Sequence, residues 1–498
     1  MMMTILYFAA VLGPMLSQQN LPDSKQADPL SLVIGSTTND YGKDVSIDKD
    51  GNILLAGYFG GTCDLDPGEG TQIVTAGGVI DTVLAKFTPA GRLIWARQIG
   101  GPGADMPHTV LADAKGDIFL TGYFMARAKF DPNEATSVKT SNGKRDLYLA
   151  KYGADGSLRW VVTIGGPEDD EGMDLAIDPQ GNVVLTGVVH GPVSLDQTHA
   201  EVKTSAASGG DEDLLIAKYS SSGNLIWGRA IGGPQADQGH AVAVAADGDL
   251  RLTGFFTGPV EVVAASDGRP ALSFAPVGSR DTFAMRLSSE GKAKWITTLG
   301  SAQDDFSAPG GICTRPDGST LWTGRLRGPT RFGGSTPRPN GADDCFVAEV
   351  DGDGKPKLAF CFGGRGGDGG HRVELDPNGN TLVGGWFTGA ADFEPGGEEK
   401  TMTAQGLNGV PDAFVAKFSP TGSLVWSTGF GGPLAQRGQG RVPDGGIAAG
   451  LTVDGQGRVL ITGRFYQTAR SYGSATGLVR TSAGGSDLFL LRLNGDGR

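Results

Sequence analysis

Six aspartates recur at one place in a repeated pattern, each five residues after a glycine that ends an apolar run. They are Asp40, Asp105, Asp170, Asp237, Asp305 and Asp368, and the seventh equivalent place holds Gln436. His108, His240 and His371 follow three residues after the second, fourth and sixth of these aspartates. Clustered carboxylates repel one another, which raises their pKa values or recruits a counter-ion, and oxygen-only ligation suits Ca²⁺ better than Zn²⁺. The pattern predicts a site for Ca²⁺, or for a polar ligand bound through it, with the three histidines nearby.

A second interpretation of the same residues is purely structural. An aspartate ahead of a strand often closes an Asx-turn, and a histidine beside it can bond locally. If the carboxylates lie too far apart to share one ion, each simply caps its own loop. The sequence leaves both interpretations open.

The elements that must position these residues come from an internal repeat. The segment DTVLAKF at Asp81 returns as DLYLAKY, DLLIAKY, DTFAMRL, DCFVAEV, DAFVAKF and DLFLLRL, at Asp146, Asp213, Asp281, Asp344, Asp412 and Asp487. Seven copies follow one another at intervals from 63 residues (281 to 344) to 75 residues (412 to 487).

Each copy carries the same order of strand signals. A short apolar alternation ends in a turn such as DKDGN, an apolar run such as NILLAGYF follows, and a long polar connection leads to the aspartate segment. After a glycine turn comes a last strand such as GRLIWARQIGG. Asp, Asn and Gly in the turns supply the positive φ that tight hairpins need. Four antiparallel strands per repeat are typical of a propeller blade, whereas the coils of a parallel β-helix are shorter.

The two ends of the repeat array complement each other. The seventh copy stops at Leu493, after its third strand, and residues 30–35 (LSLVIG) match the end of an outer strand. Completing the last blade with the N-terminal strand would remove two exposed sheet edges. The sequence therefore predicts an all-β, seven-bladed β-propeller over residues 30–493, with four antiparallel strands per blade, closed by the strand at 30–35 and followed by a tail at 494–498.

At this point the chain resembles a known family, the bacterial seven-bladed β-propeller (SBBP) repeat proteins. The resemblance covers roughly residues 30–493 and rests on the blocks D-x-x-G-N, L-T-G-x-F, D-x-F-x-A-K-[FY] and G-x-L-x-W-x-x-x-x-G-G. It implies an exported or surface protein and brings no shared catalytic residue.

Two other recurring residue types are expected to have structural roles. Trp95, Trp160, Trp227, Trp295 and Trp426 recur at the start of the outer strand, with Leu358 and Leu30 in the other two places. Rings placed once per blade are wedges for the interfaces between blades. The seven aspartates that begin the third strands are expected to accept backbone N–H bonds from the preceding loop.

The net charge and the N-terminal sequence indicate which ligands and which location to expect. A net charge of −13 would repel a phosphate backbone, so the sequence predicts no nucleic-acid binding. Residues 1–17 resemble a signal peptide whose apolar run is too short to span a bilayer, and residues 18–29 read as a linker. We expect an exported protein, periplasmic, surface-bound or secreted, with no transmembrane segment in the mature chain.

Cys345 and Cys361 lie on expected hairpin partners, so either a disulfide or buried free thiols is possible.

The motifs that the sequence lacks and the residues that it repeats indicate the class of function. No G-x-S-x-G, H-E-x-x-H or P-loop motif is present, and a catalytic site needs different residues from different blades, whereas the channel mouth mostly repeats one aspartate. We therefore expect a non-catalytic exported propeller, acting as a monomeric binding or cell-surface scaffold module for a protein or carbohydrate. Its contacts would lie at the channel mouth and on the long loops between second and third strands. The alternatives are a propeller hydrolase or lyase with a His/Asp site at the mouth, and a structural envelope component.

Overall fold

The structure, a computed structural model, describes residues 30–195, 212–263, 270–406, 409–433, 447–474 and 478–498. The expected signal peptide at 1–17, the linker at 18–29 and Gln436 lie outside these residues. Apart from one short 3-10 helix at Ala135–Ser137, the regular elements of the described residues are all strands. The expectation of an all-β propeller chain is confirmed.

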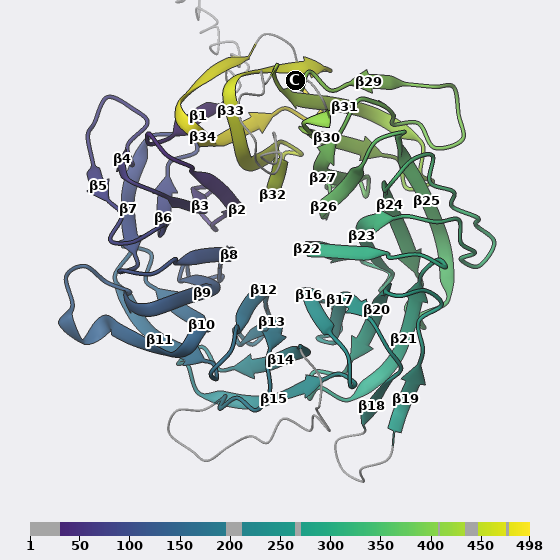
Figure 1. The fold of residues 1–498 in the computed structure, drawn as a ribbon, viewed down its shortest axis with the longest axis horizontal. Helices are drawn as coiled ribbons and strands as arrows, with labels where there is room; N and C mark the ends of the chain where they lie inside the picture. Colours follow the sequence, from purple (N-terminus) through teal and green to yellow (C-terminus); the bar gives the residue numbers. More distant parts are fainter. Residues whose placement is uncertain (1–29, 196–211, 264–269, 407–408, 434–446, 475–477) are drawn as a thin grey trace, which may run out of the picture.

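Four sheets have four antiparallel strands each, and the six- and eight-stranded sheets contain three further groups of four. These seven groups are set around a common centre (Figure 1). The inner strands, nearest that centre, are β2 (Tyr41–Ile47), β8 (Met106–Ala112), β12 (Glu171–Ile177), β16 (Asp237–Val244), β22 (Phe306–Thr314), β26 (Asp368–Leu375) and β32 (Ile447–Val453). The second strands are β3 (Ile53–Phe59), β9 (Ile118–Lys129), β13 (Val183–Val189), β17 (Leu250–Phe256), β23 (Thr320–Leu326), β27 (Thr381–Phe387) and β33 (Val459–Gly473). The third strands are β6 (Asp81–Phe87), β10 (Val138–Tyr152), β14 (Asp213–Tyr219), β20 (Asp281–Leu287), β24 (Asp344–Val350), β30 (Asp412–Phe418) and β34 (Val479–Leu493). The outer strands are β7 (Leu93–Ile99), β11 (Leu158–Ile164), β15 (Leu225–Ile231), β21 (Ala293–Leu299), β25 (Pro356–Gly364), β31 (Leu424–Gly431) and β1 (Ser31–Ile34).

The long connections between second and third strands form small hairpins at the periphery. These are β4 (Thr62–Asp64) with β5 (Ile73–Thr75), β18 (Val260–Val263) with β19 (Pro270–Phe274), and β28 (Ala390–Asp392) with β29 (Thr401–Thr403). β28 also pairs with the end of β25 in the preceding group. The hairpin of one group can therefore pair with the edge of the outer strand in the neighbouring group.

The first strand of the chain pairs with the last. β1 runs antiparallel to β34, with Ser31 opposite Leu491 and Ile34 opposite Leu488. Residues 494–498, expected to be a tail, instead close a tight turn, in which the Gly497 N–H bonds to the Asn494 carbonyl at 3.0 Å. This turn corresponds to the turns that join third to outer strands in the other groups.

Neighbouring groups are fastened by the recurring tryptophans. Trp95 on β7 donates its indole N–H to the Ala154 carbonyl, 3.1 Å away in the third-to-outer turn of the next group. Trp160, Trp227, Trp295 and Trp426 make the same bond, to Ser221, Ser289, Gly352 and Gly495. A Cβ added to Gly156 would lie 2.8 Å from the Trp95 ring, and one added to Gly91 would lie 2.3 Å from Leu30. Leu30 thus takes the tryptophan's place between the last group and the first.

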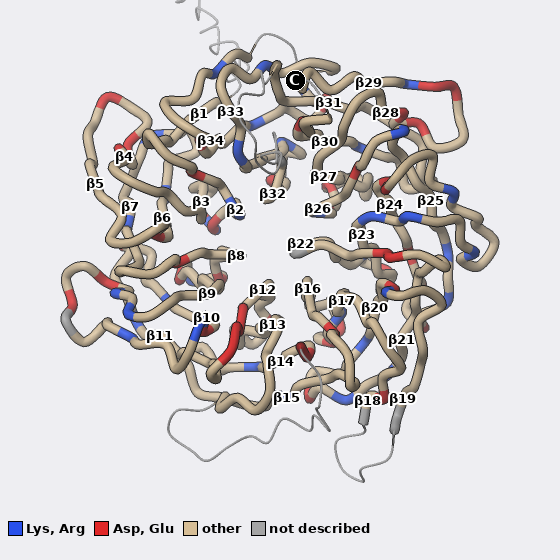
Figure 2. Tube along the Cα trace, viewed as in Figure 1, with Lys and Arg blue, Asp and Glu red and all other residues tan. Residues whose placement is uncertain are grey.

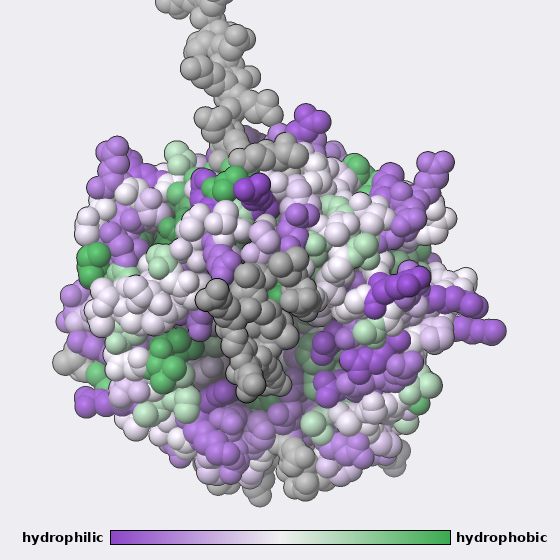
Figure 3. Space-filling view, turned by 45° about the horizontal axis from the view of Figure 1, so that its top comes forward, coloured by the Kyte–Doolittle hydropathy of each residue, from purple (hydrophilic) through white to green (hydrophobic). Residues whose placement is uncertain are grey.

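The apolar core lies between adjacent groups. One cluster joins Leu54 and Leu84 of the first group to Leu120 and Tyr148 of the second, and all four are buried. The strands are apolar on both faces because each group packs against two neighbours. Lys, Arg, Asp and Glu are interspersed along the chain (Figure 2). The face in Figure 3 is mostly polar, with small separate apolar patches.

The four cysteines are free thiols. Cys345 lies opposite Phe362 and Cys361 opposite Phe346, so the two side chains point to opposite faces of the β24–β25 pair. The expectation of a possible Cys345–Cys361 disulfide is therefore wrong, and the free-thiol alternative holds. No helix among the described residues has the length and apolar character needed to cross a membrane.

Candidate functional site

The six recurring aspartates are buried, each at most 1% exposed. Both carboxylate oxygens accept backbone N–H groups, as in Asp105, which is bonded by Gly101 at 2.9 Å and Met125 at 3.2 Å. One donor lies four residues before the aspartate and the other 20 to 22 residues after it, on or just after the second strand of the same group. The other five repeat this arrangement, with Ser36 and Gly60 on Asp40, Gly166 and His190 on Asp170, Gly233 and Thr257 on Asp237, Ser301 and Arg327 on Asp305, and Gly364 and Thr388 on Asp368.

The shared Ca²⁺ site at Asp40, Asp105, Asp170, Asp237, Asp305 and Asp368 stays a prediction. The contacts that these six carboxylates make are those of the alternative interpretation, in which each caps its own turn. In the described ranges no group of three or more His, Cys, Asp and Glu side chains could hold a metal ion. The physical reason is that a short side chain at a strand entry reaches its own backbone before it reaches another strand group.

Each aspartate of this set meets a third-strand aspartate instead. A Cβ on Gly100 would lie 2.6 Å from Asp81 Cγ and 2.8 Å from Asp105 Oδ2. Gly363 stands in the same way between Asp344 and Asp368. The Oδ1 atoms of five third-strand aspartates are buried without a hydrogen-bond partner, namely those of Asp81, Asp146, Asp213, Asp344 and Asp487. Burial raises the pKa of Asp105 to about 7, and the charge of Asp81 adds to the shift.

The three histidines occupy equivalent places on the inner strands. His108, His240 and His371 are the extra residues where the register of β8, β16 and β26 slips against the second strand. Lys43 is the corresponding residue of β2. The charges of Lys43, His108 and His240 all act on His371, so one level of the ring holds these four side chains.

None of the three histidines bonds to an aspartate of the set within the described part of the chain. His240 Nδ1 lies 2.9 Å from the Ser307 carbonyl, and its Nε2 lies 2.8 Å from Gln238 Oε1. His108 Nε2 lies 3.5 Å from Glu171 Oε2. Burial lowers the pKa of His371 to about 3 and the pKa of His240 to about 4. Both are neutral at pH 7 and are weak bases there.

A set of arginine and aromatic side chains lies at the starts of inner strands and on, or directly before, the neighbouring second and third strands. We call it the collar, and it consists of Tyr41, Tyr123, Phe255, Phe306, Arg145, Arg280, Arg325 and Arg464. Arg280 lies over Phe255 at 4.2 Å, Arg325 over Phe306 at 4.8 Å and Arg145 over Tyr123 at 4.6 Å. The side chains of Arg280, Arg325 and Arg145 are 30%, 35% and 39% exposed.

The sequence reasoning missed the collar, although it carries a signal. Tyr58, Tyr123, Phe255, Arg325, Trp386 and Arg464 each follow the recurring glycine of a second strand. Across the seven repeats that position holds an aromatic residue four times, arginine twice and valine once, at Val188, whereas the glycine before it is present in all seven. Variation between repeats at a fixed place marks the positions that the fold itself does not dictate.

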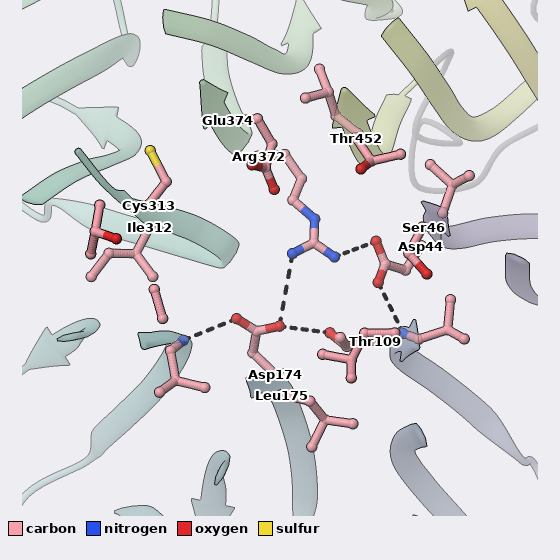
Figure 4. A pocket seen from close by; sticks show the side chains of 17 residues that line it. Asp44, Ser46, Thr109, Asp174, Leu175, Ile312, Cys313, Arg372, Glu374 and Thr452 are labelled. Atoms are coloured by element: carbon pink, nitrogen blue, oxygen red, sulfur yellow. Dashed lines mark hydrogen bonds and ion pairs between the residues drawn. The ribbon is translucent and has the colours of Figure 1, made fainter. Parts of the chain in front are cut away.

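A cavity of about 320 Å³ lies at the centre of the ring and is lined by all seven inner strands (Figure 4). Arg372 of β26 reaches across it to Asp44 of β2, with which it forms an ion pair, and lies 3.8 Å from Asp174 of β12. Unlike the aspartate set, this cavity holds different polar residues from different strand groups.

The chain is similar in sequence to a repeat family and to two curated proteins. Residues 94–123 match the family model described as "Beta-propeller repeat" (SBBP). An uncharacterized WD repeat-containing protein, L264 of Acanthamoeba polyphaga mimivirus, is 24% identical over 302 residues, which are 51% of this chain and 22% of the relative. The regulatory protein FlaEY of Caulobacter vibrioides is 24% identical over 258 residues, which are 48% of this chain and 25% of that protein. The chain thus aligns with 22% and 25% of the length of these two curated relatives.

Among solved structures, the WD40 domain of Neurospora crassa Pan2 is 9% identical, with a TM-score of 0.40, and the alignment covers 90% of this chain and 88% of that one. The match of the family model falls on strands β7, β8 and β9. The chain therefore carries the SBBP β-propeller repeat.

Proposed function

We propose that the protein is an exported, non-catalytic seven-bladed propeller, closed by β1, that binds another protein through the collar. The seven strand groups serve as the blades, and the long second-to-third connections extend the binding face. In this proposal the protein acts as a monomer outside the cytoplasm.

The observation that carries the proposal is the chemistry of the collar. Arginine is enriched at the energetic centres of protein interfaces. The collar presents partly exposed arginines over aromatic rings, of which Tyr41, Tyr123 and Phe255 are themselves buried. In the collar Arg280 and Arg325 both lie against Phe306, at 5.6 Å and 4.8 Å, so the guanidinium groups are held in place before a partner arrives. Side chains that are already ordered lose less conformational entropy on binding.

The collar and the long connections belong to the same face. The N–H of Asp105 bonds to the Ile80 carbonyl at 3.0 Å, which ties the outer-to-inner connection to the end of the second-to-third connection. Asp40, Asp170, Asp237, Asp305 and Asp368 make the same bond. The buried aspartates thus support the face without being part of the contact surface, and variable loops on such a rigid frame can carry specificity.

The alternative of a hydrolase or lyase at the channel mouth is less well supported. A general base works best with a pKa near the operating pH. Burial lowers the pKa of His240 and His371 far below that range, to about 4 and about 3. The aspartates of the expected His/Asp site are engaged by backbone N–H groups.

The proposal is tested by comparing two double variants with the unmodified mature protein. Arg280→Ala/Arg325→Ala removes two positive charges from the collar. Lys115→Ala/Lys355→Ala removes two charges from exposed turns at the opposite ends of the strands. Proteins captured from the native cell surface by each bait are quantified by mass spectrometry, and the candidate is then titrated in purified form. The proposal is supported by a partner protein whose affinity falls about tenfold or more with the collar variant and not with the control variant. Equal affinity of the partner for all three baits contradicts it. Saturable binding of glycans alone contradicts it as well.

Export is tested separately by N-terminal sequencing of the protein from its native host. Processing near residue 17 is expected. An intact Met1 on protein from the cytoplasm would contradict export and leave the collar proposal to its own test.

A further inference from the structure

The central cavity brings together polar side chains from several strand groups, and some of their atoms lack hydrogen-bond partners. It is about 320 Å³ in volume, and its polar lining includes Asp44, Ser46, Asp174, Arg372 and Glu374 (Figure 4). Since a water molecule in the liquid occupies about 30 Å³, the cavity has room for roughly ten waters or one small molecule. The seven inner strands hold its wall rigid.

Two of the carboxylates in the cavity are already satisfied. Asp44 Oδ2 accepts the Val110 N–H at 2.9 Å, and its other oxygen pairs with Arg372. Asp174 accepts the Val242 N–H and the Thr109 hydroxyl, both at 2.9 Å. The guanidinium of Arg372, whose side chain is only 12% exposed, thus serves as a strut between β26, β2 and β12.

Glu374 is different. It lies two residues beyond Arg372 on β26 and faces the same cavity, yet its carboxylate has no hydrogen-bond or ion-pair partner among the described residues. Glu374 itself is partly exposed, whereas Ser46 Oγ and Arg372 Nε are buried without a hydrogen-bond partner. A buried polar group without a partner costs free energy, so this part of the cavity favours a ligand that supplies hydrogen bonds.

The charges decide the class of that ligand. Three carboxylates, those of Asp44, Asp174 and Glu374, face the single guanidinium of Arg372. An anion would meet an excess of negative charge, and a neutral polyol would leave that excess uncompensated. A protonated amine carries both the missing positive charge and N–H donors for Glu374 and Ser46. We propose that the central cavity binds a small organic amine, with Glu374 as its counter-ion.

Protonation of Glu374 gives the proposal a second readout. Burial raises the pKa of Glu374 to about 7, and Asp44 and Asp174 add to this, while Arg372 opposes it. Cys313, which also lines the cavity, stays a neutral thiol because burial raises its pKa. Without a ligand the Glu374 carboxyl therefore holds a proton part of the time at pH 7. An ammonium group binds the carboxylate and displaces that proton, so binding near pH 7 should release protons and should tighten as pH rises from 6 to 8.

The test is calorimetric titration of the mature protein with ethanolamine, 1,4-diaminobutane and spermidine, and with acetate, glycerol and Ca²⁺. Saturable binding of at least one amine is expected, weakened about tenfold or more by Glu374→Gln and less by Ser46→Ala. Glu398→Gln, which removes an exposed carboxylate, is the matched control and should bind as the unmodified protein does. The heat of amine binding at pH 7 should depend on the ionisation enthalpy of the buffer.

Several results would overturn the proposal. These are no saturable amine binding at millimolar concentration, binding unaffected by Glu374→Gln, preference for acetate or glycerol, and saturation by Ca²⁺ alone. If Glu374→Gln fails to fold, Ser46→Ala and the buffer dependence decide the matter. None of these readouts involves the collar, so the outcome is independent of the partner-binding proposal.

Discussion

Asp81 and Asp105 face each other across Gly100, although they belong to neighbouring strand groups. Asp81 Oδ2 accepts the Gly77 N–H at 3.0 Å and the Gln98 side-chain N–H at 2.6 Å, whereas its Oδ1 is buried without a hydrogen-bond partner. The Asp105 carboxylate is the group beside it. A proton held between the two would remove both the repulsion and the orphaned oxygen.

The first prediction concerns the pH dependence of this pair. Burial raises the pKa of Asp81 and raises the pKa of Asp105 to about 7, from unfolded values near about 3.9. The stabilising proton is therefore fully bound below about pH 4 and is lost as pH rises to about 7. In Asp81→Asn the amide takes the place of the protonated carboxyl at every pH. The variant should gain stability relative to the unmodified protein as pH rises from 4 to 8, because the charge of Asp81 no longer adds to the cost of ionising the buried Asp105.

The measurement is urea unfolding of both proteins across that range. The comparison with the variant is needed because His240 and His371 change the stability in the opposite direction. Their pKa values are lowered in the fold, so their contribution to stability is present above pH 6.5 and is lost as pH falls. Asp50→Asn, at a side chain that is 61% exposed, is the control and should show no such trend. A stability difference between Asp81→Asn and the unmodified protein that stays constant with pH would contradict the shared proton.

The repeat allowed the strands, their order and the pairing of residues 30–35 with the last strand to be anticipated. Gly and Asp or Asn mark the turns, and the recurring Trp marks five of the seven outer strands, so local signals agree with the long-range arrangement. The aspartate pairs were not anticipated. Asp81 and Asp105 were assigned to separate loops, because nothing in either loop reports where the neighbouring strand group lies.

The central cavity was missed for a related reason. Asp44 and Arg372 are 328 residues apart in the chain and meet only because the inner strands surround one axis. The one-residue slips in β2, β8, β16 and β26 also change which side chains face that axis. A bulge leaves little trace in the alternation of a short strand. Period-2 patterning therefore identified the inner strands but not their inward-facing residues.

The second prediction tests the crowding at Gly100. In Gly100→Ala the new Cβ would come within 2.8 Å of both Asp81 and Asp105, closer than carbon atoms pack in proteins. We expect a loss of about 1 to 3 kcal/mol in the free energy of unfolding, as for other overpacked sites. Gly455→Ala, where nothing lies within 4 Å of the added Cβ, is the matched control. Equal stability of the two variants in urea titration would contradict the close approach.

The third prediction concerns the junction between the first two strand groups. Trp95→Phe keeps an aromatic ring against Gly156 but loses the 3.1 Å bond to the Ala154 carbonyl. One net hydrogen bond is worth about 0.5 to 1.5 kcal/mol, so the midpoint of urea unfolding should fall by a corresponding amount. Ile94→Val, on the neighbouring side chain that is 47% exposed, should have little effect. An unchanged midpoint in Trp95→Phe would show that the indole N–H does not fasten the groups.

The fourth prediction concerns closure of the ring by β1. Ile34 is 2% exposed and packs in the core between the last group and the first, beside Leu488 and Leu490. Ile34→Ala should cost about 2 to 4 kcal/mol, the usual range for a buried aliphatic side chain. Deletion of residues 30–35 should cost more, because it also leaves the edge of β34 without its partner strand and open to association with other chains. Ser31→Ala, in the same strand, removes a hydroxyl that is buried without a hydrogen-bond partner and should be neutral or slightly stabilising. Thermal unfolding and sedimentation of the three variants measure both effects. If the deletion variant stays monomeric and melts with the unmodified mature chain, the last strand group is stable with three strands and β1 does not close the ring.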